Sequence, residues 1–273
     1  LWLYNHDGAL LGHYAGFLRS MQQGATVSQA LQIGDVMVAA KARAALGRKN
    51  AFALLTRSFF ERQLQGEMAY AFGFPNARHL RQGAIQGLYR ASGSMYEAVW
   101  ERDRAKQARC SDAPLDESNA PVTQVDAPCF ASSDEALAAV DAKAFDALAA
   151  KAAAAREAVS ALRSLAFWRW RFPVSRGYRW LIDLPAGCAV LKPMGKPAAW
   201  ELIDWVCLPQ GAARLMAQIF RALEQVQCAE PEPAAIELGC WCSQALRDEF
   251  EQLPDGLRPT RIERLDFEIA KSC

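Results

Sequence analysis

Hydrophobic and polar residues alternate, or recur at helical spacing, through the first third of the chain and predict a series of strands and helices. Two apolar segments, residues 1–5 and 9–18, flank His6-Asp7-Gly8, and an Asp-Gly pair between apolar segments is a strong signal for a β-hairpin. A longer strand is predicted over residues 26–38. Residues 50–65 have apolar side chains three or four positions apart, which predicts a helix.

The segments that follow extend the same sheet. Residues 67–74 predict a further strand, and Pro75-Asn76 opens a helix that we expect to continue to Arg90. The order is therefore strand, strand, strand, loop, helix, strand and helix. This order predicts a mixed β-sheet with helices packed on it, which is an α+β fold.

The second half of the chain repeats this order after a different beginning. Ser133-Asp134 is expected to cap a helix that runs to about Leu165, with an apolar stripe that indicates burial. A hairpin, a long strand, a helix, a strand and a helix are then predicted over residues 176–194, 200–209, 211–227, 234–242 and 243–253. The pattern thus predicts a second sheet with its own helices.

Short matching segments indicate that the two halves are copies of one unit. Residues 32–38, QIGDVMV, correspond to residues 201–207, ELIDWVC, and residues 69–74 correspond to residues 235–240. The second copy has a helix and the segment FWRWRFP ahead of its hairpin, and the first copy has neither. We therefore expect the first copy to be incomplete at its N-terminus, where its first strand and helices are missing.

A polar segment with several prolines separates the two copies. Residues 104–133 carry three prolines and many small polar residues, and show little periodicity. We predict an N-terminal domain over residues 1–103, a linker or surface excursion over residues 104–133, and a C-terminal domain over residues 134–273.

Composition and charge narrow the functional classes. The chain of 273 residues is 52% hydrophobic and has a formal net charge of +1, which is typical of a globular protein and argues against broad, charge-driven binding of nucleic acid. No apolar segment approaches the roughly 20 residues needed to cross a bilayer, and no signal-peptide pattern opens the sequence. We therefore predict a cytoplasmic protein without a membrane span, of unknown oligomeric state.

The cysteines do not predict a metal site. Eight of them are scattered along the chain without the spacing of a disulfide-rich secreted scaffold. Cys240-Trp241-Cys242 would place two thiols on one face of a strand, but no second pair at zinc-ligand spacing accompanies it. We therefore expect reduced cysteines, several of them in the core, and no bound metal.

A basic segment joins the long strand to the next helix. Residues 36–52, VMVAAKARAALGRKNAF, place Arg43, Arg48 and Lys49 close to Gly47. A helix N-terminus presents unpaired backbone N–H groups and about half a positive charge. Gly47 permits close backbone approach, Asn50 can cap the helix, and cationic side chains bind phosphate. The segment is either an anion-binding loop or a solvated basic turn, and its residue types alone do not decide between the two.

Three segments of the first copy, LLGHYAGFL, QIGDVMVAAKARAALGRKNAFALL and AYAFGFPNARHLRQGAIQGLYR, resemble the GNAT superfamily of acyl-CoA-dependent N-acyltransferases. The similarity covers residues 1–90, and a weaker second copy spans residues 134–273. GDVMV, GFPN at residues 73–76 and FWRWRFP at residues 167–173 are typical of one branch of the superfamily. The resemblance implies two GNAT-like mixed β-sheets flanked by helices, with a degenerate second copy.

The resemblance also implies an acyl-CoA site in the first copy. In this superfamily, backbone amides of the loop between the long strand and the helix bind the coenzyme A diphosphate, and pantetheine lies between that strand and the next one. The residues expected to bind acetyl-CoA or another acyl-CoA are Met37, Val38, Arg43, Leu46, Gly47, Arg48, Lys49, Asn50, Ala51 and Asn76. Ala44 and Asn50 stand where the superfamily usually has glycines. The second copy has Pro209-Gln210-Gly211 in place of a basic loop, and we expect it not to bind coenzyme A.

The catalytic groups are less evident than the coenzyme site. The tyrosine that protonates the leaving thiolate in this superfamily would fall near Gly83, and Tyr89 or His79 is the candidate to replace it. Asp35, near the end of the long strand, is the candidate base, acting directly or through water. His13 is a second candidate base. Each of these side chains is also compatible with a purely structural role.

Together, these features predict an N-acyltransferase that moves an acyl group, expected to be acetyl, from coenzyme A to an amine. The acceptor, a small molecule or a peptide, is not predicted by the sequence. A non-catalytic GNAT-like binding or scaffold module is the alternative, because the usual tyrosine is missing and the loop has few glycines.

Overall fold

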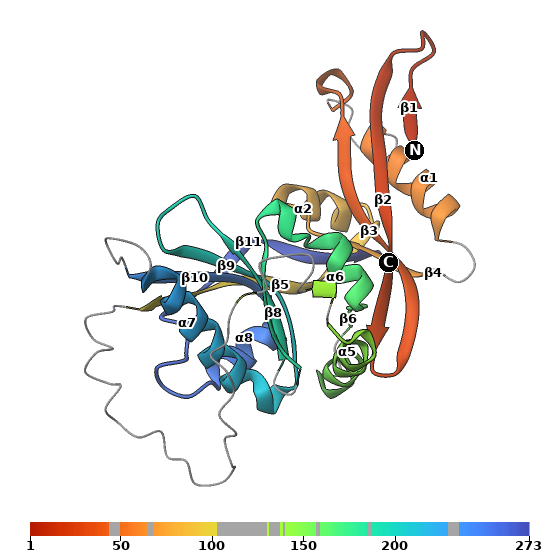
Figure 1. The fold of residues 1–273 in the computed structure, drawn as a ribbon. Coiled ribbons are helices and arrows are strands. Elements are labelled where there is room, and N and C mark those ends of the chain that lie inside the picture. The colour runs from red at the N-terminus through yellow and green to blue at the C-terminus, as the bar shows by residue number, and fades with distance from the viewer. Residues whose placement is uncertain are drawn as a thin grey trace. The chain divides into compact units, whose positions relative to one another are not determined.

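The computed structural model describes residues 1–43, 50–64, 68–102, 130, 137–138, 140–156, 159–184, 187–228 and 235–272. The chain divides into two compact units, shown in Figure 1. The first unit consists of Leu1–Met95, Val159–Leu162 and Arg264–Cys273, and the second of Tyr96–Ala158 and Arg163–Glu263. Each unit has a mixed β-sheet flanked by helices, so the predicted α+β fold with two sheets is confirmed.

Part of the predicted domain organisation lies outside the described residues. The boundaries at 103 and 133 fall there, as does the predicted linker apart from residue 130. The domain limits given by the sequence therefore stay a prediction.

The sheet of the first unit begins with a hairpin and a long strand. β1 (Trp2–Tyr4) pairs antiparallel with β2 (Leu10–Gln23), which pairs antiparallel with β3 (Thr26–Val38). Gly8, in the turn between β1 and β2, has a φ of 78°, a left-handed conformation that glycine adopts without strain. The predicted hairpin and long strand are confirmed. The short β6 (Ser160–Ala161) also pairs with β2.

The rest of this sheet is built around a parallel pair of strands. β4 (Met68–Gly73) runs parallel to β3, and the chain passes between them through the short 3-10 helix η1 (Ala40–Ala42) and α1 (Ala51–Gln63). α2 (Ala77–Ile85) and β5 (Tyr89–Arg102) follow. The strand order is β1-β2-β3-β4-β11-β5, in which β11 (Arg261–Ser272) comes from the end of the chain.

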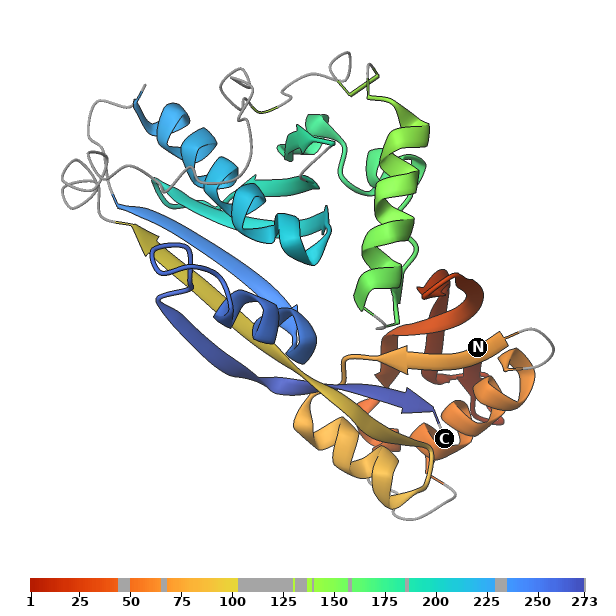
Figure 2. The same ribbon diagram turned by 90° about the horizontal axis from the view of Figure 1, so that it is seen from below.

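β11 pairs antiparallel with β4, with Ala270 opposite Gly73 and Lys271 opposite Phe72. Figures 1 and 2 show the end of β11, in blue, beside β4, in orange. Only the last part of β11 belongs to the first unit, and only the first part of β5, up to Met95, does so. The first unit therefore takes its strands from both ends of the chain.

Asparagine side chains fix where both helices of the first unit begin. The Oδ1 atom of Asn50 accepts a hydrogen bond from Ala53 N–H at 2.7 Å, and that of Asn76 accepts one from His79 N–H at 3.0 Å. The predicted cap at Asn50 is confirmed. α1 packs on β2, where Leu55 and Phe59 join a core that includes Tyr14.

The second predicted helix is shorter than the sequence pattern indicated. α2 ends at Ile85, and residues 89–102 form β5, so the expectation of a helix to Arg90 is wrong beyond Ile85. Gly87 has a φ of 65°, its N–H donates to Ala84 O, and Leu88 N–H donates to Gly83 O. This Schellman arrangement ends the helix.

From its hairpin onward, the second unit follows the same order of strands and helices as the first. Its elements are α5 (Ala142–Arg156), α6 (Leu165–Arg171), η2 (Val174–Arg176), β7 (Arg179–Asp183), β8 (Gly187–Pro193), β9 (Ala199–Cys207), η3 (Pro209–Gly211), α7 (Ala212–Cys228), β10 (Ile236–Ser243) and α8 (Gln244–Glu251). β7, β8 and β9 are antiparallel, and β9 is parallel to β10. The proposal that the two units are copies of one another stays a prediction.

Alternate residues of β7, β8 and β9 enter two different cores. Trp180, Val190 and Val206 pack in a core with α5 and α6. Leu181, Leu191 and Cys207 pack in a core with α7. Because successive side chains of a strand point to opposite faces, helices cover both faces of this sheet.

One long helix before this sheet was predicted incorrectly. α5 ends at Arg156, and a separate helix, α6, begins after Ser164, whose hydroxyl accepts a hydrogen bond from Phe167 N–H. The FWRWRFP segment lies mostly on α6 and precedes the hairpin of β7 and β8, as expected. The cap predicted at Ser133-Asp134 lies outside the described residues. Among the helices that are described, none has the length and apolar character to cross a membrane.

Candidate active site

β3 and β4 separate toward their C-terminal ends. Their paired positions run from Gln29 and Met68 to Gln32 and Phe72, and β3 then continues to Val38. A cavity of about 190 Å³, which we call the strand-gap cavity, lies between them. It is lined by Tyr14, Ile33, Gly34, Asp35, Val36, Phe52, Phe60, Ala71, Phe72, Gly73, Phe74, Pro75, His79 and Tyr89.

A second cavity, of about 360 Å³, lies where β3 ends and where α1 and α2 begin. We call it the helix-end cavity. It is lined by Val36, Met37, Val38, Ala42, Arg43, Asn50, Phe52, Asn76, Arg78, His79 and Gln82. Three of these residues, Val36, Phe52 and His79, also line the strand-gap cavity, so the two cavities adjoin.

A β-bulge directs Asp35 out of the regular strand. His13 is opposite Met37 and Ala15 is opposite Gly34, so Asp35 and Val36 together face the single residue Tyr14. Asp35 has a φ of 46°, which is uncommon for a residue other than glycine. Its side chain is 75% exposed, and its Oδ2 lies 3.1 Å from His13 Nε2.

The backbone beyond the bulge presents a polar group to the gap. Ala39 N–H donates to Leu11 O at 2.8 Å, so at this position the N–H points toward β2. Because N–H groups alternate in direction along a strand, Met37 N–H points toward β2 as well. Val38 N–H points the other way, toward the side on which β4 has separated.

The helix-end cavity has a positive electrostatic environment. Arg43, whose Nε donates to Val38 O at 2.7 Å, and Arg78 line it together with the N-termini of α1 and α2. The pKa of His79 is lowered from 6.5 by burial and by the positive charges of Arg78 and Arg43. Arginine side chains and helix N-termini are the groups that proteins use to bind phosphate.

A tyrosine from β5 fills the space beside Gly83. A Cβ atom on Gly83 would overlap Tyr89 Cζ, so the Tyr89 ring occupies the position of a side chain at residue 83. The Tyr89 hydroxyl donates to His79 O at 2.7 Å, and burial raises the pKa of Tyr89 to about 12. Burial also raises the pKa of Tyr14, the neighbouring tyrosine of the cavity.

The structure brings together the three residues that the sequence singled out for catalysis. Asp35, His79 and Tyr89 all line the strand-gap cavity. The predicted coenzyme-binding residues Met37, Val38, Arg43, Asn50 and Asn76 line the helix-end cavity, and Ala51 begins α1. Leu46, Gly47, Arg48 and Lys49 lie outside the described residues.

The sequence did not single out several residues that line these cavities. Arg78 is two positions beyond the recognised GFPN segment, and a cationic residue in the first turn of a helix was a usable signal for an anion site. Tyr14, Phe52 and Phe72 were counted only as apolar members of strands and helices. Their position around a cavity depends on the separation of β3 and β4, which no local pattern predicts.

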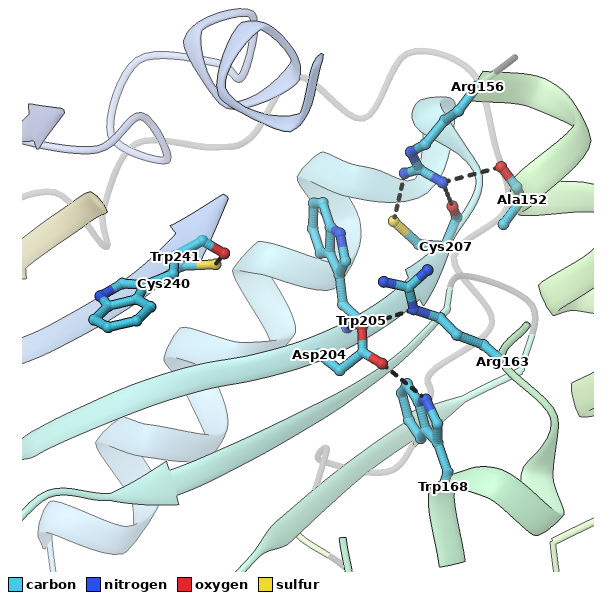
Figure 3. Close-up of polar contacts among 9 residues, drawn as sticks. All are labelled: Ala152, Arg156, Arg163, Trp168, Asp204, Trp205, Cys207, Cys240 and Trp241. Carbon is cyan, nitrogen blue, oxygen red and sulfur yellow. Dashed lines mark hydrogen bonds and ion pairs between the residues drawn. The ribbon is translucent and has the colours of Figure 1, made fainter. Parts of the chain in front are cut away.

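The second unit has an aspartate, Asp204, at the corresponding place on β9, but its carboxylate is enclosed (Figure 3). Asp204 accepts hydrogen bonds from Arg163 Nε at 2.8 Å, Trp168 Nε1 at 3.1 Å and Trp205 N–H at 3.0 Å. Its side chain is 12% exposed. Three donors thus satisfy this carboxylate.

Arg156 links the C-terminal end of β9 to α8 in the same unit. Its guanidinium donates to Cys207 O at 2.7 Å, and to both carboxylate oxygens of Glu249 on α8, at 2.8 and 2.9 Å (Figure 3 shows the contact with Cys207). Trp205 packs against Phe250 of α8, with ring centroids 5.1 Å apart. These contacts join β9 to α8 at the place that corresponds to the helix-end cavity of the first unit.

The buried thiols of the second unit remain protonated. Burial raises the pKa of Cys207 to about 11, that of Cys242 to about 12 and that of Cys240 well above its usual value. As predicted, Cys240 and Cys242 share the buried face of β10, while Trp241 is exposed. In the described part of the chain, no group of three or more His, Cys, Asp or Glu residues is placed to hold a metal ion.

Comparison with known proteins finds similar structures but no protein with a similar sequence. No protein-family model and no curated protein matches the chain. A GCN5-related N-acetyltransferase from Kribbella flavida is similar in structure, with a TM-score of 0.60 and 17% sequence identity over 98% of this chain and 58% of that one. A probable N-acyltransferase from Enterococcus faecalis has a TM-score of 0.61 and 11% identity over 97% of this chain and 60% of its own.

N-myristoyltransferase from Saccharomyces cerevisiae, whose structure holds myristoyl-CoA, is similar with a TM-score of 0.52 and 9% identity, over 98% of this chain and 65% of that protein. The chain thus spans about three fifths of the length of these proteins. Their agreement over almost the whole chain shows that it has the fold of the GNAT superfamily.

Proposed function

We propose that the first unit is an acyl-CoA-dependent N-acyltransferase that transfers an acyl group to an amine. The observation that carries this proposal is the separation of β3 from β4 after Gln32, which leaves two adjoining cavities in a chain with the GNAT fold. Structural neighbours described as N-acetyltransferases and as an N-myristoyltransferase support it. The expected acyl group is acetyl.

The residues around the helix-end cavity fit the diphosphate of coenzyme A. Arg43 and Arg78 supply cationic donors, and the N-termini of α1 and α2 supply backbone N–H groups. Val38 N–H would contact pantetheine in the gap, whereas Met37 N–H points toward β2 and Met37 would only line the helix-end cavity. Asn50 and Asn76 hold the two helix starts, and Leu46, Gly47, Arg48, Lys49 and Ala51 complete the proposed binding loop.

Asp35 is the proposed base. Bound acyl-CoA would supply an activated carbonyl group, and the acceptor nitrogen must lose a proton as it forms the amide bond. The exposed Asp35 carboxylate, at the edge of the strand-gap cavity, is placed to take that proton and pass it to water.

Tyr89 is the proposed hydrogen-bond donor to the leaving sulfur. With a pKa of about 12, Tyr89 keeps its proton at neutral pH. Complete transfer of that proton to a thiolate of ordinary pKa, about 8.5, would be uphill by roughly 5 kcal/mol. Tyr89 therefore acts by turning its hydroxyl from His79 O to the sulfur and donating a hydrogen bond there, and water supplies the proton that the sulfur finally takes up. His79 is neutral at pH 7 because its pKa is lowered, and it lies between the two cavities.

A non-catalytic acyl-CoA-binding module is the second candidate. The Tyr89 hydroxyl already donates to His79 O, and position 83, where the superfamily's tyrosine is expected, is glycine. Measurement of turnover separates the two candidates, because only the enzyme releases the coenzyme A thiol when an amine is added.

Calorimetry with acetyl-CoA tests the proposed site. We expect wild-type protein to bind, and Arg43→Ala combined with Arg78→Ala to bind roughly 100-fold more weakly, since each charge-assisted hydrogen bond contributes about 1.5 kcal/mol. Arg247→Ala is the control, because Arg247 forms an exposed ion pair with Glu251 in the second unit. Equal affinity of the double variant and the control would contradict the proposed site. Binding without thiol release on a panel of amines would favour the module.

A further inference from the structure

His13 holds the Asp35 carboxylate from the neighbouring strand. His13 Nε2 lies 3.1 Å from Asp35 Oδ2, and the His13 side chain is only 13% exposed although its partner is open to solvent. The other ring nitrogen, Nδ1, is buried and has no hydrogen-bond partner among the described residues. The geometry therefore assigns the proton to Nε2, which donates to Asp35. A second proton on the ring would leave a buried N–H without an acceptor, which is costly.

Trp2 covers the His13 ring on the side away from Asp35. Trp2 is opposite His13 in the pairing of β1 with β2, and His13 is opposite Met37 in the pairing of β2 with β3. The centroids of the Trp2 and His13 rings are 5.0 Å apart. Cross-strand partners share one face of a sheet, so these three side chains lie on one face.

That face is the one opposite α1. Gly12, the neighbour of His13, faces α1, because a Cβ atom there would lie 2.9 Å from Leu55 Cδ1. His13 points to the other side, as alternation along a strand requires. The Asp35 carboxylate contacts His13 and so is presented on the same outer face.

Three exposed apolar side chains lie near Asp35, on β2, on β3 and beside the strand-gap cavity. Phe17 packs over Gly34, where a Cβ atom would lie 2.9 Å from its ring, and is 52% exposed. Phe74, 45% exposed, lines the strand-gap cavity together with Asp35, and Met37 is two residues along β3. A carboxylate beside exposed aromatic rings suits an organic ammonium ion, which pairs with the charge and packs on the rings.

We propose that the outer face around Asp35 binds the acceptor as an ammonium group attached to an apolar or aromatic body, and that His13 is the positioning residue for Asp35. This inference rests on the proposed acyltransferase function and adds the chemical class of the acceptor. Asp35 pairs with the ammonium, takes one proton from it and leaves the nitrogen with a free electron pair. His13 keeps the carboxylate turned toward that nitrogen.

The first experiment measures amine binding without coenzyme. Saturation-transfer NMR compares 2-phenylethylamine, spermidine and glucosamine on the full chain. We expect 2-phenylethylamine to bind at least tenfold more tightly than glucosamine, and Asp35→Asn or Phe74→Ala to weaken it about tenfold. Trp241→Ala, which removes an exposed tryptophan of the second unit, should have no effect. Tighter binding of spermidine or glucosamine, or equal binding by Asp35→Asn, would overturn the proposal. Because no coenzyme is present, this result is independent of whether acyl transfer occurs.

The second experiment isolates the role of His13. His13→Phe keeps a ring and removes the donor, whereas His13→Gln keeps an N–H donor. With acetyl-CoA and 2-phenylethylamine, we expect His13→Phe to lower kcat about tenfold with little change in KM, and His13→Gln to recover most of the loss. His6→Phe is the control, since His6 forms a similar pair with Asp7 on the exposed hairpin turn. Equal kcat for His13→Phe and the control would refute the positioning role.

A spectroscopic measurement covers the case in which no amine is acylated. Long-range ¹H–¹⁵N spectra should show the proton of His13 on Nε2, and its signal should shift when 2-phenylethylamine is added. If the protein turns over no amine but this shift is observed, the acyltransferase proposal fails and the amine site stands. A proton on Nδ1, or no shift at saturating amine, would refute the role of His13.

Discussion

Asp35 in the first unit and Asp204 in the second are carboxylates at corresponding places with opposite surroundings. Each lies at an irregularity in the long strand that runs parallel to the next strand, β3 in one unit and β9 in the other. Asp35 has one described polar partner, His13, and is 75% exposed, whereas Asp204 accepts three hydrogen bonds and is 12% exposed.

The difference comes from what covers the two sheets. In the second unit, α5 and α6 pack on the face opposite α7, and the segment around α6 supplies Arg163 and Trp168 to Asp204. In the first unit, the described residues leave Trp2, Phe17 and Met37 exposed on the face opposite α1. A carboxylate that three donors neutralise is a structural element, while one with free lone pairs is available to a ligand. An aspartate at a bulge of the long strand therefore supports two different roles, set by the side chains that reach its carboxylate.

The largest effect is expected from removal of Asp204. Asp204→Ala leaves the Arg163 guanidinium and the Trp168 N–H without their acceptor, and should lower the free energy of unfolding by about 3 kcal/mol. Asp35→Ala should change it by less than about 1 kcal/mol, because exposed pairs contribute little. Urea denaturation followed by tryptophan fluorescence measures both. Similar losses of unfolding free energy in the two variants would contradict the distinction between a structural carboxylate and one that is available to a ligand.

The next effect concerns Gly83, whose side-chain space Tyr89 fills. An alanine in an exposed helix position normally stabilises by up to about 1 kcal/mol relative to glycine. Gly83→Ala should instead destabilise by about 2 kcal/mol, because its Cβ would overlap the Tyr89 ring. The same change in a Tyr89→Ala background should be neutral or stabilising. Gly239→Ala in the second unit is the control for overlap, since its Cβ would lie 4.0 Å from Trp200 O, at an ordinary contact distance.

The smallest effect is a shift in the pKa of His79. Arg78→Gln removes one of the charges that lower this pKa, so NMR titration should show it move up toward 6.5. Arg81→Gln, on the same helix but not among the charges that act on His79, should leave the pKa of His79 unchanged.

The lowered pKa of His79 also makes the free energy of unfolding fall as the pH drops below 6.5, because the unfolded state binds the proton first. His79→Gln should reduce that fall, and an unchanged pH dependence would contradict it.

Local signals predicted the elements that depend on local chemistry. Three predicted features depend only on residues a few positions apart, and all three are confirmed: the Asp-Gly turn, the strand over residues 26–38 and the cap at Asn50. β5 and β11 were missed because they are held by partners far away in the sequence. The Ala-rich stripe after residue 140 suggested one long helix, and α5 and α6 are separate.

Residue types predicted which residues belong to the candidate site, but not how those residues are arranged. Asp35, His79 and Tyr89 were chosen from a resemblance and from their chemistry, and they line one cavity. The Tyr89 ring fills the space that a side chain at position 83 would occupy. This depends on the turn at Gly87, which carries the chain back from α2 into β5. The sequence signal for this arrangement was Gly83 itself, at a position where a tyrosine was expected.

The pairing of β11 with β4 has a consequence for how the protein is made. The first unit contains residues 1–95, but one of its strands comes from residues 264–272, which a ribosome synthesises about 170 residues later. Until then, one edge of β4 has unpaired backbone groups that attract other extended chains. Contacts between such distant residues also form slowly. A nascent chain therefore leaves this sheet unfinished until residues 264–272 have emerged, so deletion of these residues should harm the fold of residues 1–95.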